Sequence, residues 1–289
     1  MPRTPISRTA SVLLRFSPAA LCATVCLILS GSADAHQLWI ETSPTAEGGK
    51  LHKIEVCWGH SGERTTGKSL AGQQAKLSAC LLTPDGTRTD LSPSLGDDCF
   101  TAKTTPEVPG YYTFGAELQV GILPREFHGI PANTRIVMYG KTLTHVPGKE
   151  EGLENPVGSD LEIVPMTPRT ELRRGGVVCA KLLFHGKPLG GKGVEVSLAT
   201  AGSPPLPEHR RIQSHEWSID AMPDPYTGEM AFPLIASGEH TFLIRYTDET
   251  PGTYDGPRND VSDFSHLRKG DKYERTMYMS TLTVSVADE

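Results

Sequence analysis

Residues 177–196 read VVCAKLLFHGKPLGGKGVEV, and they are the clearest indication of the fold. Val177–Phe184 and Val194–Leu198 are predicted strands, because short apolar runs bounded by turn residues are typical of strands. The intervening residues 186–191, Gly-Lys-Pro-Leu-Gly-Gly, favour a turn. A strand, a turn and a second strand in this order often begin a small β-sandwich of the immunoglobulin or transthyretin type.

The same apolar alternation, with a period of two residues, recurs along the chain and predicts an all-β protein. Turn residues separate the expected strands, as at Asp85-Gly86, Pro109-Gly110 and Thr227-Gly228. The 29 glycines and 23 prolines argue against long helices. Besides the two strands above, we expect Ile54–Trp58, Lys76–Leu82, Tyr111–Leu118, Arg135–Tyr139, His240–Tyr246 and Thr276–Val286.

The pattern divides the chain into two β-sandwich domains, residues 36–163 and 164–289. At residues 161–172, LEIVPMTPRTEL places two prolines after a strand-like segment, and a polar, glycine-rich run precedes it at residues 148–158. The second domain is expected to be immunoglobulin-like or transthyretin-like. Residues 248–272 are polar and contain Gly and Pro, so we expect a loop or flap there before the last strand.

The N-terminal segment has the three parts of a secretory signal peptide, and residues 1–35 are expected to be removed. Three arginines precede an apolar run, Ala19–Leu29, which is too short to span a bilayer. Ala33-Asp34-Ala35 is the small-residue pattern after which signal peptidase cuts. We therefore expect an exported, periplasmic protein that does not span the membrane and begins at His36.

The charge of the expected mature chain argues against nucleic acid as a partner. Removing residues 1–35 takes away three Arg and one Asp, which leaves 25 basic and 33 acidic residues and a formal net charge of −8. Phosphate binding requires a basic surface, whereas an acidic protein mildly favours the accumulation of cations.

Four cysteines remain after the leader, and an even number in an oxidising compartment favours disulfides. Cys80 and Cys99 flank the turn at Pro84-Asp85-Gly86, so these two are expected to pair. By elimination, Cys57 would then pair with Cys179. No Cys-x-x-Cys motif is present in the sequence, which argues against a thiolate zinc site.

Two histidines, His36 and His60, are the first candidate metal ligands. As a first residue, His36 would offer its ring nitrogen and its α-amine, whose pKa of about 8 lets a metal displace the proton at neutral pH. His60 lies in VCWGHSGE after an expected strand, where Gly59 would aim the imidazole off the strand end. Two imidazoles and an amine suit nickel, copper or zinc. The ordinary alternatives are chance for His36 and turn capping for His60.

His128 and His145 lie on either side of the expected strand Arg135–Tyr139, and either could supply a third imidazole. Trp39 and Trp58 are expected in the sandwich core, although they could also wall a metal site. The other histidines considered are expected to have no ligand role: His185, His209, His215, His240 and His266.

Short motifs in a fixed order connect the chain to a known family: AHQLWIE (35–41), VCWGHSGE (56–63), PGYYTF (109–114), TRIVMYGKT (134–142), LEIVPMTP (161–168), LLFHGKPLGGKGVEV (182–196) and YMSTLTVSV (278–286). With the leader, they make the chain resemble the nickel uptake transporter family, periplasmic proteins described as components of nickel or cobalt uptake. The resemblance implies metal ligation by His36 and His60, with membrane components of a metal-uptake transporter as partners. The chain departs from the family pattern at Ser61, where proline is common, and in its cysteines.

Three functions are compatible with these residues. The first is a non-enzymatic metal-binding accessory protein for nickel or cobalt uptake, where the choice of metal rests on the resemblance. The second is a copper enzyme or copper-binding protein in which His36 and His60 form a histidine brace. The third is an adhesive or structural envelope sandwich without metal. The sequence lacks the motifs of serine hydrolases, zinc peptidases, P-loop proteins and dinucleotide-binding proteins.

We predict that the exported protein begins at His36, because the Ala-x-Ala triplet directs signal peptidase to that bond. Intact mass spectrometry of protein purified from the periplasm reads the first residue directly. A start at any other residue would remove the α-amine from the expected ligands.

Overall fold

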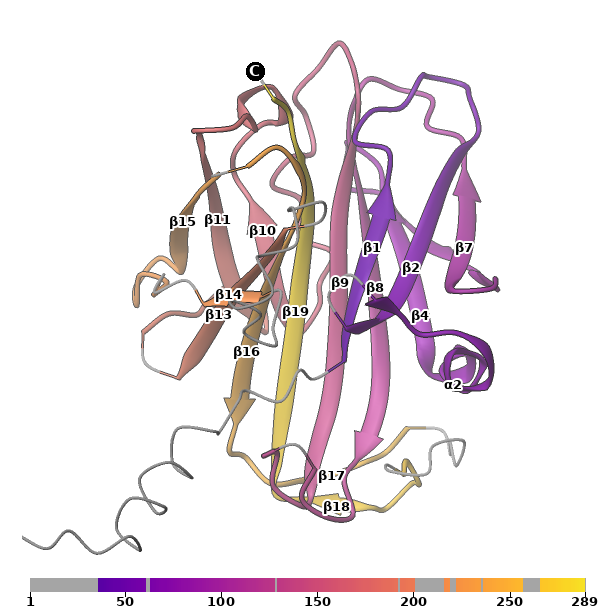
Figure 1. The fold of residues 1–289 in the computed structure, drawn as a ribbon, viewed down its shortest axis with the longest axis vertical. Coiled ribbons are helices and arrows are strands. Elements are labelled where there is room, and N and C mark those ends of the chain that lie inside the picture. Colours follow the sequence, from indigo (N-terminus) through magenta and orange to yellow (C-terminus); the bar gives the residue numbers. More distant parts are fainter. Residues whose placement is uncertain are drawn as a thin grey trace, which may run out of the picture. The chain divides into compact units, whose positions relative to one another are not determined.

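The computed structural model describes residues 36–60, 63–127, 129–191, 193–200, 216–218, 222–234, 236–256 and 266–288, and the leader expected at residues 1–35 lies outside them. Asp34–Glu289 form one compact unit. Its described part is an all-β sandwich, as the alternation predicted (Figure 1). Within that part, no helix has the length and apolar character of a transmembrane span.

The described residues form one large sheet of eight strands, in the order β14-β13-β16-β19-β9-β8-β4-β5 (Figure 1). The eight strands expected from the alternation are all present in the fold, most of them longer than expected. The strands of the large sheet are β4 (Leu77–Leu82), β5 (Arg88–Leu91), β8 (Gly110–Ile122), β9 (Thr134–Val146), β13 (Val194–Thr200), β14 (Glu216–Ser218), β16 (Gly238–Asp248) and β19 (Arg275–Val286), of which β5 and β14 were not expected from the sequence.

Two smaller sheets pack on the large one. The N-terminal small sheet has the order β1-β2-β7-β6, with β3 paired to β2: β1 (Gln37–Thr42), β2 (His52–His60), β3 (Glu63–Arg64), β6 (Ser94–Leu95) and β7 (Cys99–Thr104). The C-terminal small sheet has β11 (Val177–Phe184) between β10 (Leu161–Pro165) and both β12 (Lys187–Pro188) and β15 (Glu229–Pro233). Short helical turns are α2 (Gly67–Ala71), η1 (Gln74–Lys76) and η2 (Arg169–Glu171).

Strands from the two expected domains meet in the large sheet. β9 pairs in parallel with β19, from Thr134↔Arg275 to Thr142↔Thr283. The other neighbouring strands of this sheet pair antiparallel. The residues expected as 36–163 and 164–289 therefore share one continuous sheet.

Two hydrophobic cores lie on opposite faces of the large sheet, because successive side chains of a strand point to opposite faces. On β9, Ile136 and Met138 belong to the core under the N-terminal small sheet, which includes Phe100. Val137 and Tyr139 belong to the core under the C-terminal small sheet. The central strands are thus covered on both faces.

β1 packs closely on the large sheet at Gly140. A Cβ built at Gly140 would lie 3.3 Å from Cγ1 of Ile40 and 3.5 Å from the carbonyl oxygen of Leu38, so a larger side chain would push β1 outward. The Thr281 hydroxyl donates a hydrogen bond of 2.6 Å to that same Leu38 carbonyl. These contacts hold the first strand against both β9 and β19.

The segment expected as a loop or flap is anchored at both ends. β17 (Gly252–Thr253) pairs with β18 (Lys272–Tyr273), and Tyr254 and Leu267 pack on Ile122 of β8. Residues 257–265 of this segment lie outside the described part of the chain.

The expected disulfide pairing is wrong. Cys57 is bonded to Cys99, with Cα atoms 4.6 Å apart, because β2 and β7 are neighbours and their register sets these two residues directly opposite. Cys80 is a buried free thiol on β4, in the large sheet, and Cys179 is an exposed free thiol on β11. Cys80 and Cys99 flank the same turn in the sequence, but they do not pair because they lie in different sheets.

We predict that replacing both Cys57 and Cys99 with serine lowers the free energy of unfolding by ~4 kcal/mol, since the bond closes a span of 42 residues. Urea unfolding of the oxidised protein measures the change. The matched control Cys179→Ser should differ from the parent by less than ~0.5 kcal/mol. Equal losses in both variants would contradict the assignment.

Candidate functional site

His36 and His60 lie opposite each other because of the register between β1 and β2. The strands are antiparallel, and their first pair joins Gln37 to Gly59. His36 precedes β1 and His60 ends β2, so the same register carried one residue further sets them across from each other. Their ring centroids are 4.3 Å apart and their planes are tilted by 52°. Binding of one ion by both histidines requires the N-terminal strand to run beside the strand containing Trp58, and β1 does run beside β2.

His60 was expected just beyond the end of a strand, but it lies within one. β2 does not end at Trp58 but continues through Gly59 to His60, which pairs with Glu63 of β3. The imidazole therefore belongs to a paired strand rather than to a loop, and the strand register sets its position.

Trp58 forms one wall of this histidine pair. Residues two apart on a strand share a face, so Trp58 lies on the same side of β2 as His60. Its indole stacks on the His36 ring at a centroid distance of 4.4 Å and an angle of 30°. Trp58 also belongs to the buried core, whereas Trp39 packs against the disulfide. The spacing Trp-Gly-His was the sequence signal for this arrangement.

The described residues supply two of the three nitrogen donors expected for a metal ion, the imidazoles of His36 and His60. Nδ1 of His60 is shielded from solvent and has no hydrogen-bond partner among the described residues. Such a group costs roughly 1–3 kcal/mol when buried, so Nδ1 is a candidate donor to a metal. The two imidazoles are together, and the further donor expected from the sequence is the α-amine of a chain that begins at His36.

His145 does not join this pair. Its ring stacks on Tyr111 at 4.4 Å, and its Nε2 lies 2.8 Å from the carbonyl oxygen of Lys149. The bridge partner of His145 is Thr45, nine residues along the chain from His36. At about 3.3 Å per residue of strand, the six residues of β1 alone separate the two histidines by roughly 20 Å.

Within the described part of the chain, no third imidazole joins the pair. His128 lies outside the described residues, as do His209 and His215. His185 and His266 each face a carboxylate, at 3.1 Å from Asp160 and 2.7 Å from Asp271 respectively. Across the described ranges, no three His, Cys, Asp or Glu side chains gather as a metal site.

Comparison with protein families gives one match. Residues 33–248 match the family described as "Domain of unknown function (DUF4198)". The chain belongs to the DUF4198 family. The matched region covers about three quarters of the chain, includes His36, Trp58 and His60, and ends with β16. No curated protein matches the chain.

In this DUF4198 chain, ion pairs tie down the hairpin that carries His60. Arg64 of β3 pairs with Gly59 in the strand ladder. Its guanidinium contacts Glu41 of β1 and lies 2.9 Å from Asp98, which directly precedes β7. One side chain thus connects β3 to both neighbours of β2.

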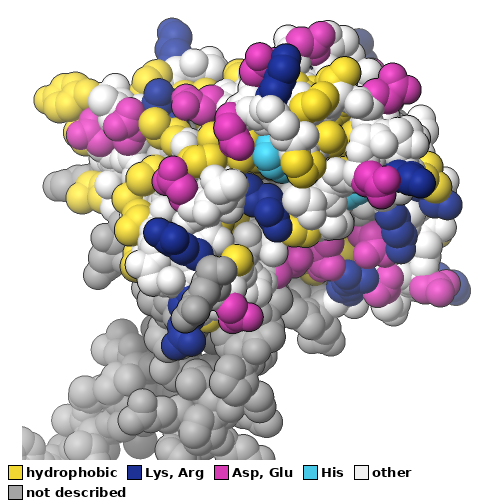
Figure 2. All heavy atoms as spheres, turned by 90° about the horizontal axis from the view of Figure 1, so that it is seen from above, with side chains coloured by type: hydrophobic (Ala, Val, Ile, Leu, Met, Phe, Trp, Pro, Cys, Tyr) yellow, Lys and Arg dark blue, Asp and Glu magenta, His cyan; other side chains and the backbone are white. Residues whose placement is uncertain are grey.

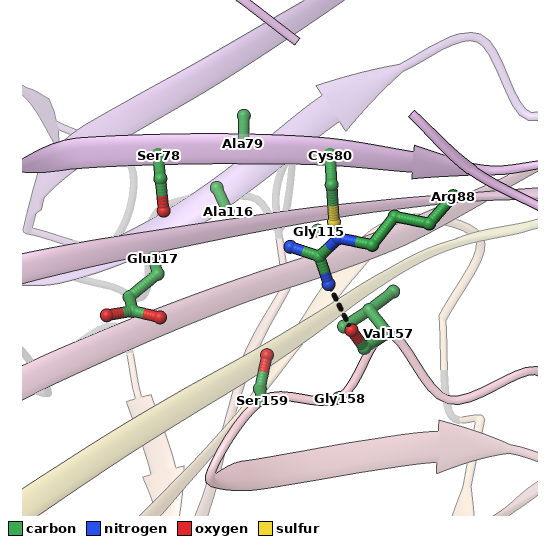
Figure 3. A pocket seen from close by; sticks show the side chains of 10 residues that line it. All are labelled: Ser78, Ala79, Cys80, Arg88, Gly115, Ala116, Glu117, Val157, Gly158 and Ser159. Atoms are coloured by element: carbon green, nitrogen blue, oxygen red, sulfur yellow. Dashed lines mark hydrogen bonds between the residues drawn. The ribbon is translucent and has the colours of Figure 1, made fainter. Parts of the chain in front are cut away.

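A pocket that is partly open to solvent lies apart from the DUF4198 histidine pair, between β4, β5, β8 and residues 157–159 (Figure 3). Arg88 spans it and donates a hydrogen bond of 2.6 Å to the carbonyl oxygen of Val157. Cys80 lines the cavity beneath Arg88. Burial raises the pKa of the Cys80 thiol, so the thiol is protonated at neutral pH and is a poor nucleophile.

We predict a pH-dependent gain of stability in Glu239→Gln. Burial, and secondly the charge of Glu41, raise the pKa of Glu239 to about 7, above its ordinary value of 4.5. The stabilisation associated with the protonated carboxyl is fully present below pH 4.5 and is lost as the pH rises through 7. The variant should therefore gain stability over the parent at pH 8 and show a smaller gain at pH 4.5.

Thermal unfolding of the two proteins at both pH values measures this difference. The control is Glu195→Gln, an exposed glutamate on the neighbouring strand β13, which should show no such trend. A gain of the same size at both pH values would contradict the prediction.

Proposed function

We propose that the protein is a periplasmic metal-binding accessory protein that takes up a divalent nickel or cobalt ion at His36 and His60 and passes it to a membrane uptake transporter. The observation that carries the proposal is the approach of the two imidazole rings to 4.3 Å. The proposal includes a cleaved leader, because the third donor is the α-amine of His36. On this view the protein binds and transfers an ion and is not an enzyme.

The chemistry of the donors supports a late first-row transition metal. Imidazole and amine nitrogens suit nickel, copper, zinc and cobalt rather than calcium or magnesium, which prefer oxygen ligands. His36 and His60 would each donate one ring nitrogen in the neutral form. Trp58 would hold the His36 ring in place and exclude water from one side of the site.

Nickel or cobalt is favoured by the resemblance to the nickel uptake transporter family, not by ligand affinity. The same three nitrogens bind copper more tightly, following the general order of divalent metals. A copper histidine-brace protein is therefore the second candidate, supported by the same pair of imidazoles. Delivery to a transporter would make selectivity depend on which metal the partner accepts.

We predict that His60→Ala weakens nickel binding at least tenfold, because one of three donors is removed. The protein used is the exported form beginning at His36, and calorimetry with Ni²⁺ measures the affinity. His185→Ala is the matched control, because His185 is half-exposed and lies outside the pair. Adding one glycine before His36 should weaken binding as strongly, since the amine moves away from the ring.

Quenching of Trp58 fluorescence provides a second readout, because the indole touches the His36 ring. Parallel titrations with Co²⁺ and Cu²⁺, and an assay for copper-dependent oxidation, separate the accessory protein from the copper enzyme. Unchanged nickel binding in both His60→Ala and the extended protein would reject the site. No binding of any of these metals would favour a structural envelope protein.

A further inference from the structure

A second cavity lies near the opposite end of β1 from the histidine pair. It is partly open to solvent and is lined by Pro44, which follows β1, and by residues from the ends of β8, β9 and β19. The segment that includes Pro165, Arg169 and Leu172 closes one side of it. This end of the molecule is the one viewed in Figure 2, where charges of both signs and apolar side chains are interspersed.

The walls of this cavity are mainly apolar. Leu143, Leu153, Leu172 and Val284 are among the residues that line it. An apolar cavity with a few polar groups at one side is the usual form of a small-molecule site.

Arg169 supplies the cationic group at the wall. The Nε atom of Arg169 is shielded from solvent and has no hydrogen-bond partner among the described residues. None of the ion pairs in the described part of the chain involves Arg169. A guanidinium beside an apolar cavity without a carboxylate partner favours binding of an anion there.

The hydroxyl of Tyr111 lies beside Arg169 and is neutral. The Tyr111 oxygen accepts a hydrogen bond of 2.8 Å from the backbone N–H of Arg169, and its hydroxyl donates one of 2.8 Å to Glu150. Burial raises the pKa of Tyr111 to about 12, so the phenol stays protonated at neutral pH. The phenol therefore adds no charge beside Arg169, and the carboxylate that it binds, Glu150, is not among the residues that line the cavity.

We propose that this cavity binds a small amphipathic monocarboxylate, with its apolar chain between the leucines and its carboxylate on Arg169. An arginine matches a planar carboxylate with two parallel hydrogen bonds, and the apolar walls suit a hydrocarbon chain rather than a sugar phosphate. The site is separate from His36 and His60 and does not depend on the metal proposal.

The test uses hexanoate and its neutral amide, hexanamide, titrated into the exported protein and followed by two-dimensional NMR. Hexanoate should shift the signals of cavity residues such as Leu143 and Val284 and bind at least tenfold more tightly than hexanamide. This comparison needs no variant and tests the charge requirement on the parent protein. Equal binding of the two compounds, shifts confined to another region, or no binding of hexanoate would overturn the proposal.

Two variants of matched charge test the residue itself. Arg169→Gln should weaken hexanoate binding at least tenfold, whereas Arg173→Gln, an exposed arginine four residues away, should leave it unchanged. His60→Ala should also bind hexanoate normally, which separates this site from the metal site. Unchanged hexanoate affinity in Arg169→Gln would overturn the proposal.

Discussion

The parallel pairing of β9 with β19 is the constraint on which the rest of the structure depends. A parallel pair requires a long crossover, and here the crossover is the whole chain between Val146 and Arg275, including the C-terminal small sheet. Both strands are covered on their two faces, so their alternating side chains enter two different cores. One sheet therefore forms a layer of both sandwiches, which the sequence pattern predicts as two separate domains.

A buried ion pair shows how closely the layers are joined. The Lys141 ammonium of β9 lies 2.6 Å from the Glu162 carboxylate of β10, and both side chains are almost fully buried. The backbone N–H groups of Val157 and Gly158 donate further hydrogen bonds to Glu162. Burial lowers the pKa of Lys141, while the charge of Glu162 opposes that effect. Breaking such a pair by removing one partner leaves an uncompensated charge, which is far more costly than the loss of a surface pair.

The histidine pair depends on two constraints that meet at β1. Hydrogen-bond register with β2 sets His36 across from His60, and packing at Gly140 and Thr281 holds β1 against the large sheet. Arg64 then secures the hairpin from the other face of the small sheet. The Arg169 cavity lies beyond the other end of β1, where the ends of β8, β9 and β19 line it.

The sequence alone was sufficient for the all-β class and for eight of the strands. These features depend on local alternation, since burial of one face leaves a period of two residues in each strand. His36 and His60 could be proposed together because the Ala-x-Ala triplet makes His36 the expected first residue and because His60 follows Gly59 after an expected strand.

Contacts between distant strands could be known only from the fold. The parallel β9–β19 pairing leaves no local signal, because any apolar strand can pair with any other. The same reason explains the cysteines: Cys80 and Cys99 share a turn in sequence, but Cys99 pairs with Cys57 across two neighbouring strands. His145 was separated from His36 by the length of β1, and Arg169 was brought to an apolar cavity by the packing of three strand ends. Sequence patterns report which face of a strand is buried, whereas tertiary packing determines what it is buried against.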